Sequence, residues 1–450
     1  MIRLNLSEIA ATLGCAAPEI DATIDDIVSD SRKVHFGTLF AALPGSQVDG
    51  HDFAGAAAQM GATALLVSRP LDIDIPQLLV EDVLQALGRI AAMLRQRIAP
   101  QAVIGITGSN GKTTVKEMVA SILGREGDVL ATQGNFNNEL GLPLSLFALE
   151  PRHRYAVMEM GASKPGDISY LCGIAQPDIG LITNIGPAHL KGFGSEEGVA
   201  RTKGELFASL PANGCAILNA DETWIGLWRE MNAAGRSLSF GTSPDCDIFL
   251  DECGETPGLR LPDGEFELRL SLPGRHNLMN AAAAAAVAVS LGISPATIQA
   301  GLEAVEAVPG RLNLLHTDAG WTVINDTYNS NPASLYAALR VLSEMQGKAW
   351  LVLGDMKELG EGSRKMHREV GEAAKVMGVS RLFATGEMSA YTVDSFGAGA
   401  EHFASREELI AVLSKELHPG VICLVKGSRS MGMETVVEAI VRKNGMREAS

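Results

Sequence analysis

The sequence predicts an α/β protein with three domains: a small α/β N-terminal domain, a central domain with a mainly parallel sheet, and a C-terminal Rossmann-like domain. Three observations lead to this expectation. Short apolar runs typical of buried strands alternate with helical patterns along most of the chain. A Gly-rich loop joins one of these runs to a helical pattern. The chain has 450 residues, which is more than a single hydrophobic core usually holds.

The ends of helical patterns and the prolines that follow them indicate the domain boundaries. A helical pattern at 83–98 closes the first block, and Pro100 separates it from the next strand, so we predict domains at 1–100, 101–310 and 311–450. Apolar runs predict strands of the central block at 101–106, 155–160, 179–185 and 215–219, and a turn-rich antiparallel appendage at 240–272. In the third block strands are predicted at 322–325, 349–353, 382–384 and 421–425, which favours a second doubly wound domain.

Composition excludes some classes of function. The net charge of −16 argues against a nucleic acid or an anionic membrane as the main partner, although a local basic site can still bind a small anion. The apolar stretch at 281–289 is much shorter than the roughly 20 residues of a membrane span. We therefore interpret it as an alanine-rich helix packed on a sheet, and expect neither a signal peptide nor a membrane anchor.

The six cysteines are scattered and form no C-x-x-C pair. This pattern argues against a structural zinc site and favours a reduced chain in the cytoplasm. Cys246 and Cys253 are close enough in sequence to meet in space, but nothing in the sequence requires it.

The Gly-rich loop has the context of a phosphate-binding loop, between a buried strand at 101–106 and a helical pattern from Val115. Glycines let the backbone approach phosphate groups, and the helix N-terminus directs N–H groups at the anion. Lys112 supplies a cation, and Thr113 is placed to hold Mg²⁺. Ile106 stands where the longer form of the motif has glycine, so this is the short G-x-x-G-K-T form. The loop consists of Thr107, Gly108, Ser109, Asn110, Gly111, Lys112, Thr113 and Thr114. We expect it to bind a nucleoside triphosphate.

Polar residues at or after the ends of neighbouring strands are further candidates, because ligands bind beyond the carboxyl ends of parallel strands. Glu159 ends one strand and is a possible Mg²⁺ ligand facing Thr113, or an ordinary solvated glutamate. His189 follows the next strand and is either a ligand or a loop histidine. Lys203 lies in a predicted helix, where spacing alone favours a lysine that faces solvent.

Three polar clusters lie further along the chain. Asn277 stands near the start of the alanine-rich helix, where it can cap that helix. Arg311 follows the predicted domain junction and can reach across to a phosphate, or belongs to a simple hinge turn. Asp326 ends a strand of the third block and can bind ribose hydroxyls, although the Asn- and Asp-rich stretch before Pro332 also suits a turn.

Taken in order, these motifs resemble the Mur ligase family, which builds the peptide stem of bacterial cell-wall precursors. The resemblance covers nearly the whole chain. It rests on TGSNGKTT, on MEMGAS with Glu159, on His189 and Lys203, and on GRHNLMNA, PGR and NDTYNSNPAS. The N-terminal DSR and FGTLFAALPGSQVDGHDF are similar to the UDP-substrate domain of the later-acting members.

The resemblance implies roles for these residues. Glu159 and His189 would be Mg²⁺ ligands, and Lys203 would be carbamylated and support a second Mg²⁺. Asn277 would contact adenine, Arg311 the terminal phosphate of ATP, and Asp326 the ribose. Ser31 and Arg32 would hold the uridine diphosphate end of the substrate, while Asn137 and Asn138 would lie toward the substrate channel.

Within the family, GNFNN, GLPLSL, LGDMKELG and VKGSRSMGME match the member that joins D-alanyl-D-alanine to UDP-N-acetylmuramoyl-tripeptide. The Asp-Asn-Pro-Arg motif of the relative that adds the third stem residue is absent. The resemblance thus implies an ATP-dependent amide ligase that works as a monomer through an acyl phosphate. The alternatives are that sister ligase, a ligase of the cyanophycin or folate type, and a phosphate-loop ATPase or switch protein.

Overall fold

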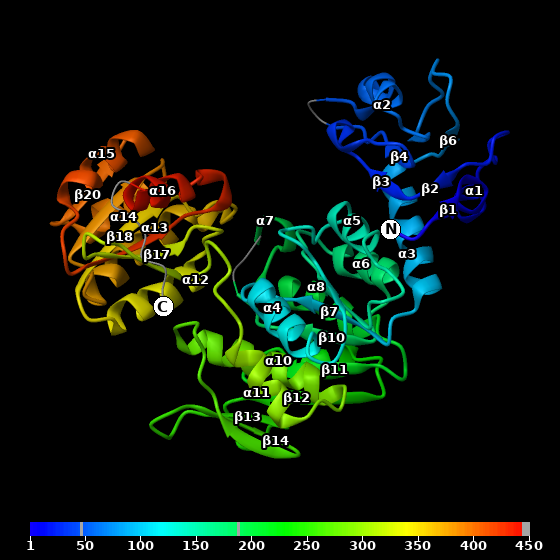
Figure 1. Cartoon of the computed structure of the whole chain (residues 1–450). Coiled ribbons are helices and arrows are strands. Elements are labelled where there is room, and N and C mark those ends of the chain that lie inside the picture. Colours follow the sequence, from blue (N-terminus) through cyan, green and yellow to red (C-terminus); the bar gives the residue numbers. More distant parts are fainter. Residues whose placement is uncertain (46–47, 187–189, 443–450) are drawn as a thin grey trace.

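The computed structural model describes residues 1–45, 48–186 and 190–442, with the side chains of 190 and 191 left out of the description, and these residues form three α/β domains (Figure 1). In Figure 1 the first domain is blue, the central domain runs from cyan to green, and the third domain is yellow to red. The first and third domains lie at opposite ends of the central one. Within the described residues, no helix is long and apolar enough to cross a bilayer.

The first domain contains a parallel sheet and a short antiparallel ribbon. The sheet has the order β3 (Asp26–Val28), β4 (Thr38–Ala41), β5 (Ala64–Val67) and β6 (Gln77–Leu79). The ribbon pairs β1 (Leu4–Asn5) with β2 (Thr23–Ile24), and the helices are α1 (Leu6–Leu13), α2 (Ala54–Gln59) and the 3₁₀ turns η1 (Ser31–Lys33) and η2 (Gly50–Phe53).

Helix α3 (Val83–Ile98) has the bounds that the sequence predicted, and it joins the first domain to the central one. It begins where the Asp82 carboxylate accepts a hydrogen bond from the Gln85 N–H at 3.0 Å, which is the usual chemistry of an N-cap. Its apolar face is buried in one core together with residues of both domains. The Arg95 guanidinium adds an ion pair to Asp178 at 3.1 Å. The two domains therefore share a packed interface.

The central domain is built on a nine-stranded sheet with β7 (Ala102–Thr107) near its middle. Its strands lie in the order β15 (Gly264–Glu267), β14 (Gly258–Leu261), β13 (Ile248–Asp251), β12 (Arg236–Gly241), β11 (Cys215–Asn219), β10 (Ile179–Ile182), β7, β9 (Tyr155–Glu159) and β8 (Val129–Ala131). Strands β8 to β13 and β7 pair in parallel, whereas β13, β14 and β15 are antiparallel. The predicted antiparallel appendage at 240–272 is confirmed for β13 to β15, which extend the main sheet, whereas β12 and β13 pair in parallel.

Helices cover both faces of this sheet. One face carries α4 (Lys112–Leu123), α10 (Arg275–Ser290) and α11 (Pro295–Glu303). The other carries α5 (Gly141–Leu146), α6 (Asp167–Ala175) and α8 (Glu196–Ala208) together with α3, while α7 (Leu190–Phe193) and α9 (Ile225–Met231) lie beside α8. The alanines of α10 are buried along the whole run from Ala281 to Ala286, as the sequence predicted. Small side chains let this helix approach both the sheet and α4 closely.

The third domain is a doubly wound sheet, which confirms that prediction. Its order is β16 (Asn313–His316), β17 (Thr322–Asp326), β21 (Val421–Lys426), β18 (Lys348–Gly354), β19 (Arg381–Thr385) and β20 (Ala400–Phe403), with β16 antiparallel to β17. The helices α12 (Pro332–Glu344), α13 (Ser363–Val376) and α14 (Ser389–Phe396) cover one face, and α15 (Arg406–Glu416) and α16 (Glu434–Arg442) cover the other.

Cys246 and Cys253, in the central domain, do not form a disulfide.

Candidate active site

A cleft of about 1130 Å³ opens where the central and third domains face each other. Most of the residues singled out in the sequence line it. They are Gly108, Ser109, Asn110, Gly111, Lys112, Thr113, Thr114, Asn137, Asn138, Glu159, Lys203, Asn277, Arg311 and Asp326. Thr107 lies buried at the end of β7, just behind this wall. The carboxyl ends of the two sheets thus meet at one cavity, as expected for open α/β folds.

The phosphate-binding loop requires its two glycines. Gly108 has a φ of 149°, and a Cβ there would lie 1.8 Å from the Thr183 Oγ1 atom. Gly111 has a φ of 81°, and a Cβ there would lie 2.6 Å from Asn280 Oδ1. L-residues with a side chain rarely adopt these conformations. The loop therefore depends on glycine for both backbone conformation and space.

Helix α4 begins at Lys112, three residues earlier than the apolar pattern indicated. Its first N–H groups therefore belong to the loop and are available to an anion. The Lys112 Nζ atom donates to the carbonyl of Gly108 at 2.7 Å. Burial lowers the pKa of Lys112, the Glu159 carboxylate raises it, and the Arg311 guanidinium lowers it. A bound anion would offset both the burial and the repulsion between these two cations.

Glu159 is buried at the end of β9 and is held at both carboxylate oxygens. Thr113 Oγ1 donates to Oε2 at 2.7 Å, and Asn137 Nδ2 donates to Oε1 at 2.7 Å. The solvated alternative is therefore wrong, because β9 ends inside the cleft wall rather than at the surface. A carboxylate has about four lone-pair positions, so two remain open.

The donor set at this point fits Mg²⁺. A threonine hydroxyl and a carboxylate are hard oxygen ligands, and they lie beside a loop shaped for phosphate. Among the described residues, no group of three or more His, Cys, Asp or Glu side chains is arranged as a metal cage. Mg²⁺ usually takes one or two carboxylates and completes its shell with water and phosphate oxygens, so the simpler donor set is sufficient. His189 lies outside the described residues.

Lys203 is buried, with 4% of its surface exposed, so the expectation of a lysine that faces solvent is wrong. It lies on the same face of α8 as the buried Val199 and Leu206, at spacings of four and three residues. Desolvation lowers its pKa well below the usual value for lysine, and the charge of Lys112 lowers it further. Burial and the neighbouring Lys112 thus both disfavour the protonated form of this amine.

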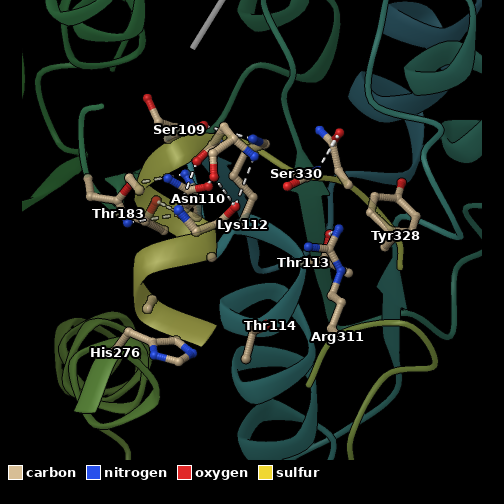
Figure 2. A pocket seen from close by; sticks show the side chains of 18 of the residues that line it. Ser109, Asn110, Lys112, Thr113, Thr114, Thr183, His276, Arg311, Tyr328 and Ser330 are labelled. Carbon is tan, nitrogen blue, oxygen red and sulfur yellow. Dashed lines mark hydrogen bonds between the residues drawn. The ribbon is translucent and has the colours of Figure 1, made fainter. Parts of the chain in front are cut away.

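Arg311 brings the third domain to the phosphate-binding loop. Its Nη2 atom donates to Thr113 Oγ1 at 2.7 Å, and its guanidinium stacks over the ring of Tyr328 at 4.1 Å. Figure 2 shows this guanidinium between Tyr328 and Thr113. Its Nε atom is buried and has no hydrogen-bond partner within the part of the chain that the structure describes. The chain does turn at Gly310, but the alternative of a solvated arginine is wrong, and a donor remains for an anion in the cleft.

Asn277 is the third residue of α10 and does not cap it, because Gly274 holds the N-cap position. Its Nδ2 atom donates to the Pro273 carbonyl at 2.7 Å, and its Oδ1 atom accepts from Asn280 at 3.1 Å. The helix starts two residues earlier than Asn277, so the cap interpretation is wrong. The side chain is nevertheless in the cleft wall.

Asp326 ends β17 and is already paired. The Lys426 Nζ atom donates to its Oδ2 atom at 2.5 Å, and the Leu312 N–H donates to Oδ1 at 3.2 Å. The alternative of a plain turn is therefore wrong for Asp326. Lys426 was not predicted to have a role, although it ends β21 as Glu159 ends β9, and this position at a strand end was the available signal.

The structure adds a contact between domains that the sequence did not indicate. Asn331, the N-cap of α12, donates from Nδ2 to the Oδ1 atom of Asn110 at 2.8 Å. By contrast, Ser31 and Arg32 lie in η1 of the first domain and do not line the cleft. The Arg32 side chain is exposed and pairs with Asp30 at 2.8 Å.

Together, the fold and the site define a phosphate-loop protein of three α/β domains with a cleft between the second and third. The chain belongs to the Mur ligase family. Residues 23–95 match the model of the Mur ligase family catalytic domain, 106–288 the Mur ligase middle domain, and 310–429 the Mur ligase glutamate ligase domain.

Relatives and solved structures agree with this assignment. The chain is 43% identical to the UDP-N-acetylmuramoyl-tripeptide–D-alanyl-D-alanine ligase of Escherichia coli K12, over 99% of this chain and 100% of that protein. A crystal structure of MurF from Acinetobacter baumannii matches with a TM-score of 0.91 and 34% identity, covering 98% of this chain and 99% of that one. MurF ligase from Thermotoga maritima, in complex with ADP, matches with a TM-score of 0.82 and 30% identity, covering 93% and 97%.

Proposed function

We propose that this chain is an ATP-dependent amide ligase of peptidoglycan precursor synthesis. It joins D-alanyl-D-alanine to the tripeptide carboxylate of UDP-N-acetylmuramoyl-tripeptide. The observation that carries the proposal is the convergence of Lys112, Arg311 and the Thr113–Glu159 pair on one end of the cleft. Its specificity for the dipeptide rests on relatives of that name that are 34–43% identical over nearly the whole chain.

The reaction needs the transfer of a phosphoryl group and then the attack of an amine. The γ-phosphoryl group of ATP passes to the tripeptide carboxylate and gives an acyl phosphate. The amine of D-alanyl-D-alanine attacks this carbonyl, and phosphate leaves from the tetrahedral intermediate. Such transfers depend mainly on positioning and on charge neutralisation. Lys112 and Arg311 supply positive charge from opposite walls, and the free Nε–H of Arg311 suits a phosphate oxygen.

Mg²⁺ would be held by Thr113 and Glu159, with His189 and Lys203 as further ligands, and we expect two ions. When bound, it neutralises charge on the transferring phosphate. The case for Lys203 rests on its burial and its lowered pKa, since a neutral amine can react with CO₂ to form a carbamate. A carbamate would place a negative charge on this buried side chain, within reach of the Lys112 charge.

The remaining contacts follow the same division of the chain. The backbone of 107–114 would cradle the phosphates, Asn277 would contact adenine, and Asp326 the ribose, although its oxygens already accept hydrogen bonds from Lys426 and Leu312. Asn137 and Asn138 would lie on the side of the peptide substrate. Ser31 and Arg32 would bind the uridine diphosphate end from the first domain. The monomeric state and the cytoplasmic location, where ATP and nucleotide-linked sugars are made, stay predictions.

Mass spectrometry of the products tests the proposal directly. The enzyme is incubated with ATP, Mg²⁺, UDP-N-acetylmuramoyl-tripeptide and D-alanyl-D-alanine. A species heavier than the tripeptide by one dipeptide less one water supports it. Unchanged tripeptide, with folded enzyme that binds ATP, favours a sister ligase with another amine. Phosphate release that needs neither substrate would instead favour an ATPase or switch protein.

A further inference from the structure

Lys116 is a buried cation that the proposed chemistry does not use. It lies on α4 four residues after Lys112, so both lysines are on one face of the helix. Only 2% of its surface is exposed. Its Nζ atom donates to the Thr132 carbonyl at 2.6 Å and pairs with the half-exposed Glu117 at 2.7 Å. A buried ammonium is unfavourable unless it is well paired, so this contact calls for an explanation.

Thr132, the partner of Lys116, is tied to β9 at two further atoms. It directly follows β8, and its N–H donates to the Val157 carbonyl at 3.0 Å. Its Oγ1 atom accepts a hydrogen bond from the Glu159 N–H at 3.0 Å. With the Lys116 contact, every polar atom of Thr132 has a partner. This residue therefore fixes the backbone of Glu159 relative to α4.

The loop that follows Thr132 also contacts Glu159, through its carboxylate. After Thr132, the loop 133–138 carries Asn137, which donates to Glu159 Oε1 at 2.7 Å. The carbonyl of Asn137 in turn accepts from the Gly161 N–H at 2.7 Å. On the opposite side, Thr113 of α4 donates to Glu159 Oε2. Glu159 is thus held through its backbone N–H and both carboxylate oxygens. Lys116 in turn holds Thr132, the residue that accepts from the Glu159 N–H.

We propose that Lys116 is a positioning residue, which fixes Thr132 and thereby sets the place of the Glu159 carboxylate and the loop 133–138. The inference rests on the proposed role of Glu159 toward Mg²⁺. Removing a group that hydrogen-bonds to a metal ligand and orients it typically lowers metal affinity or activity about 10–100-fold. A purely structural lysine would instead lower stability and leave the properties of each folded molecule unchanged.

The test measures binding of the β,γ-methylene analogue of ATP by calorimetry, with Mg²⁺ and with EDTA, because this needs neither peptide substrate. Lys116→Met keeps the apolar stem and removes the donor. We expect the Mg²⁺-dependent gain in affinity to fall about tenfold or more, with little change in EDTA, and Lys116→Arg to restore part of it. Lys375→Met is the matched control, since Lys375 also donates to a carbonyl, that of Ala398 at 2.8 Å, far from the cleft.

A second variant keeps the inference testable if Lys116→Met does not fold. Thr132→Val removes only the hydroxyl that accepts from Glu159, and it should produce the same loss. Folded Lys116→Met, or Thr132→Val in its place, with the Mg²⁺ dependence of the wild type would overturn the inference. The inference would also be overturned if the wild-type protein bound the analogue equally well with Mg²⁺ and with EDTA. A wild type that binds Mg²⁺ and the analogue but makes no product refutes the proposed function alone.

Discussion

Arg311 and Thr113 lie in different domains, 198 residues apart in sequence, yet the guanidinium donates to the threonine hydroxyl at 2.7 Å. That hydroxyl in turn donates to Glu159. The third domain therefore contacts the phosphate-binding loop at Thr113, the residue that holds the Glu159 carboxylate. Any change in the separation of the two domains must alter this contact, which links domain position to the geometry around Glu159.

Replacing Lys112 by alanine should abolish turnover and leave the fold intact. The lysine is the cation of the phosphate-binding loop, and removal of one charge-stabilising group commonly costs about a hundredfold or more in rate. Phosphate release in the presence of both substrates measures the effect, and circular dichroism checks the fold. Lys415→Ala, at an exposed position of α15, is the control. Near-normal turnover of Lys112→Ala would refute the assignment of the loop.

Replacing Lys203 by alanine should also abolish activity, and added short carboxylates should restore part of it. The variant leaves a space where we place a carbamate, and a small carboxylate can fill it with the same charge. Steady-state rates with and without acetate or formate are the measurement. Arg201→Ala changes an exposed residue of the same helix and should need no rescue. Full activity of Lys203→Ala without additives would show that its burial has only a structural role.

Replacing Arg311 by lysine should lower kcat substantially, because an ammonium cannot keep both the planar contact with Tyr328 and the reach to Thr113. Arg311→Ala should lose about a hundredfold or more. The control is Arg260→Lys, which removes a similar contact over Phe249 at 4.7 Å, in the antiparallel part of the sheet. If Arg311→Lys keeps the full kcat, the guanidinium is not needed for phosphoryl transfer.

Asp355 should make stability depend on acid pH. Burial raises the pKa of this carboxyl, but hydrogen bonds from Lys357 and Ser389 outweigh it, so the pKa lies below the ordinary 3.8. The resulting stabilisation is present above pH 3.8 and is lost as pH falls through the lower pKa of the folded state. Asp355→Asn should therefore be less stable at pH 7 and lose less on acidification. Urea unfolding at several pH values measures both, and parallel pH profiles would contradict the prediction.

The sequence was most informative where periodicity and strand ends coincide. The helix at 83–98 and the strand at 215–219 have the predicted bounds, because each has a continuous apolar pattern and clear punctuation. The edge strands β16 and β20 were not predicted. Both have one open side and mix polar with apolar residues, so neither shows the apolar run of a central strand.

The site was predictable in part for similar reasons. Glu159 and Asp326 could be placed at strand ends by a rule of topology. The burial of Lys203 was missed, although Val199 and Leu206 at helical spacing indicate which face of α8 is covered. The partners of Asp326 and Arg311 come from other elements and from a domain junction, and a single sequence does not state which distant residues meet.

The cleft has a consequence for how the molecule can be blocked. One wall carries Asn110 and Thr113, and the other carries Asn331 and Arg311. The side-chain hydrogen bonds from Asn331 to Asn110 and from Arg311 to Thr113 join the two walls. A small compound that replaced both of these bonds would hold the two domains apart at the spacing seen here. Such an inhibitor would not need to resemble a whole nucleotide, but it would occupy the groups that we assign to the phosphates and would therefore compete with ATP.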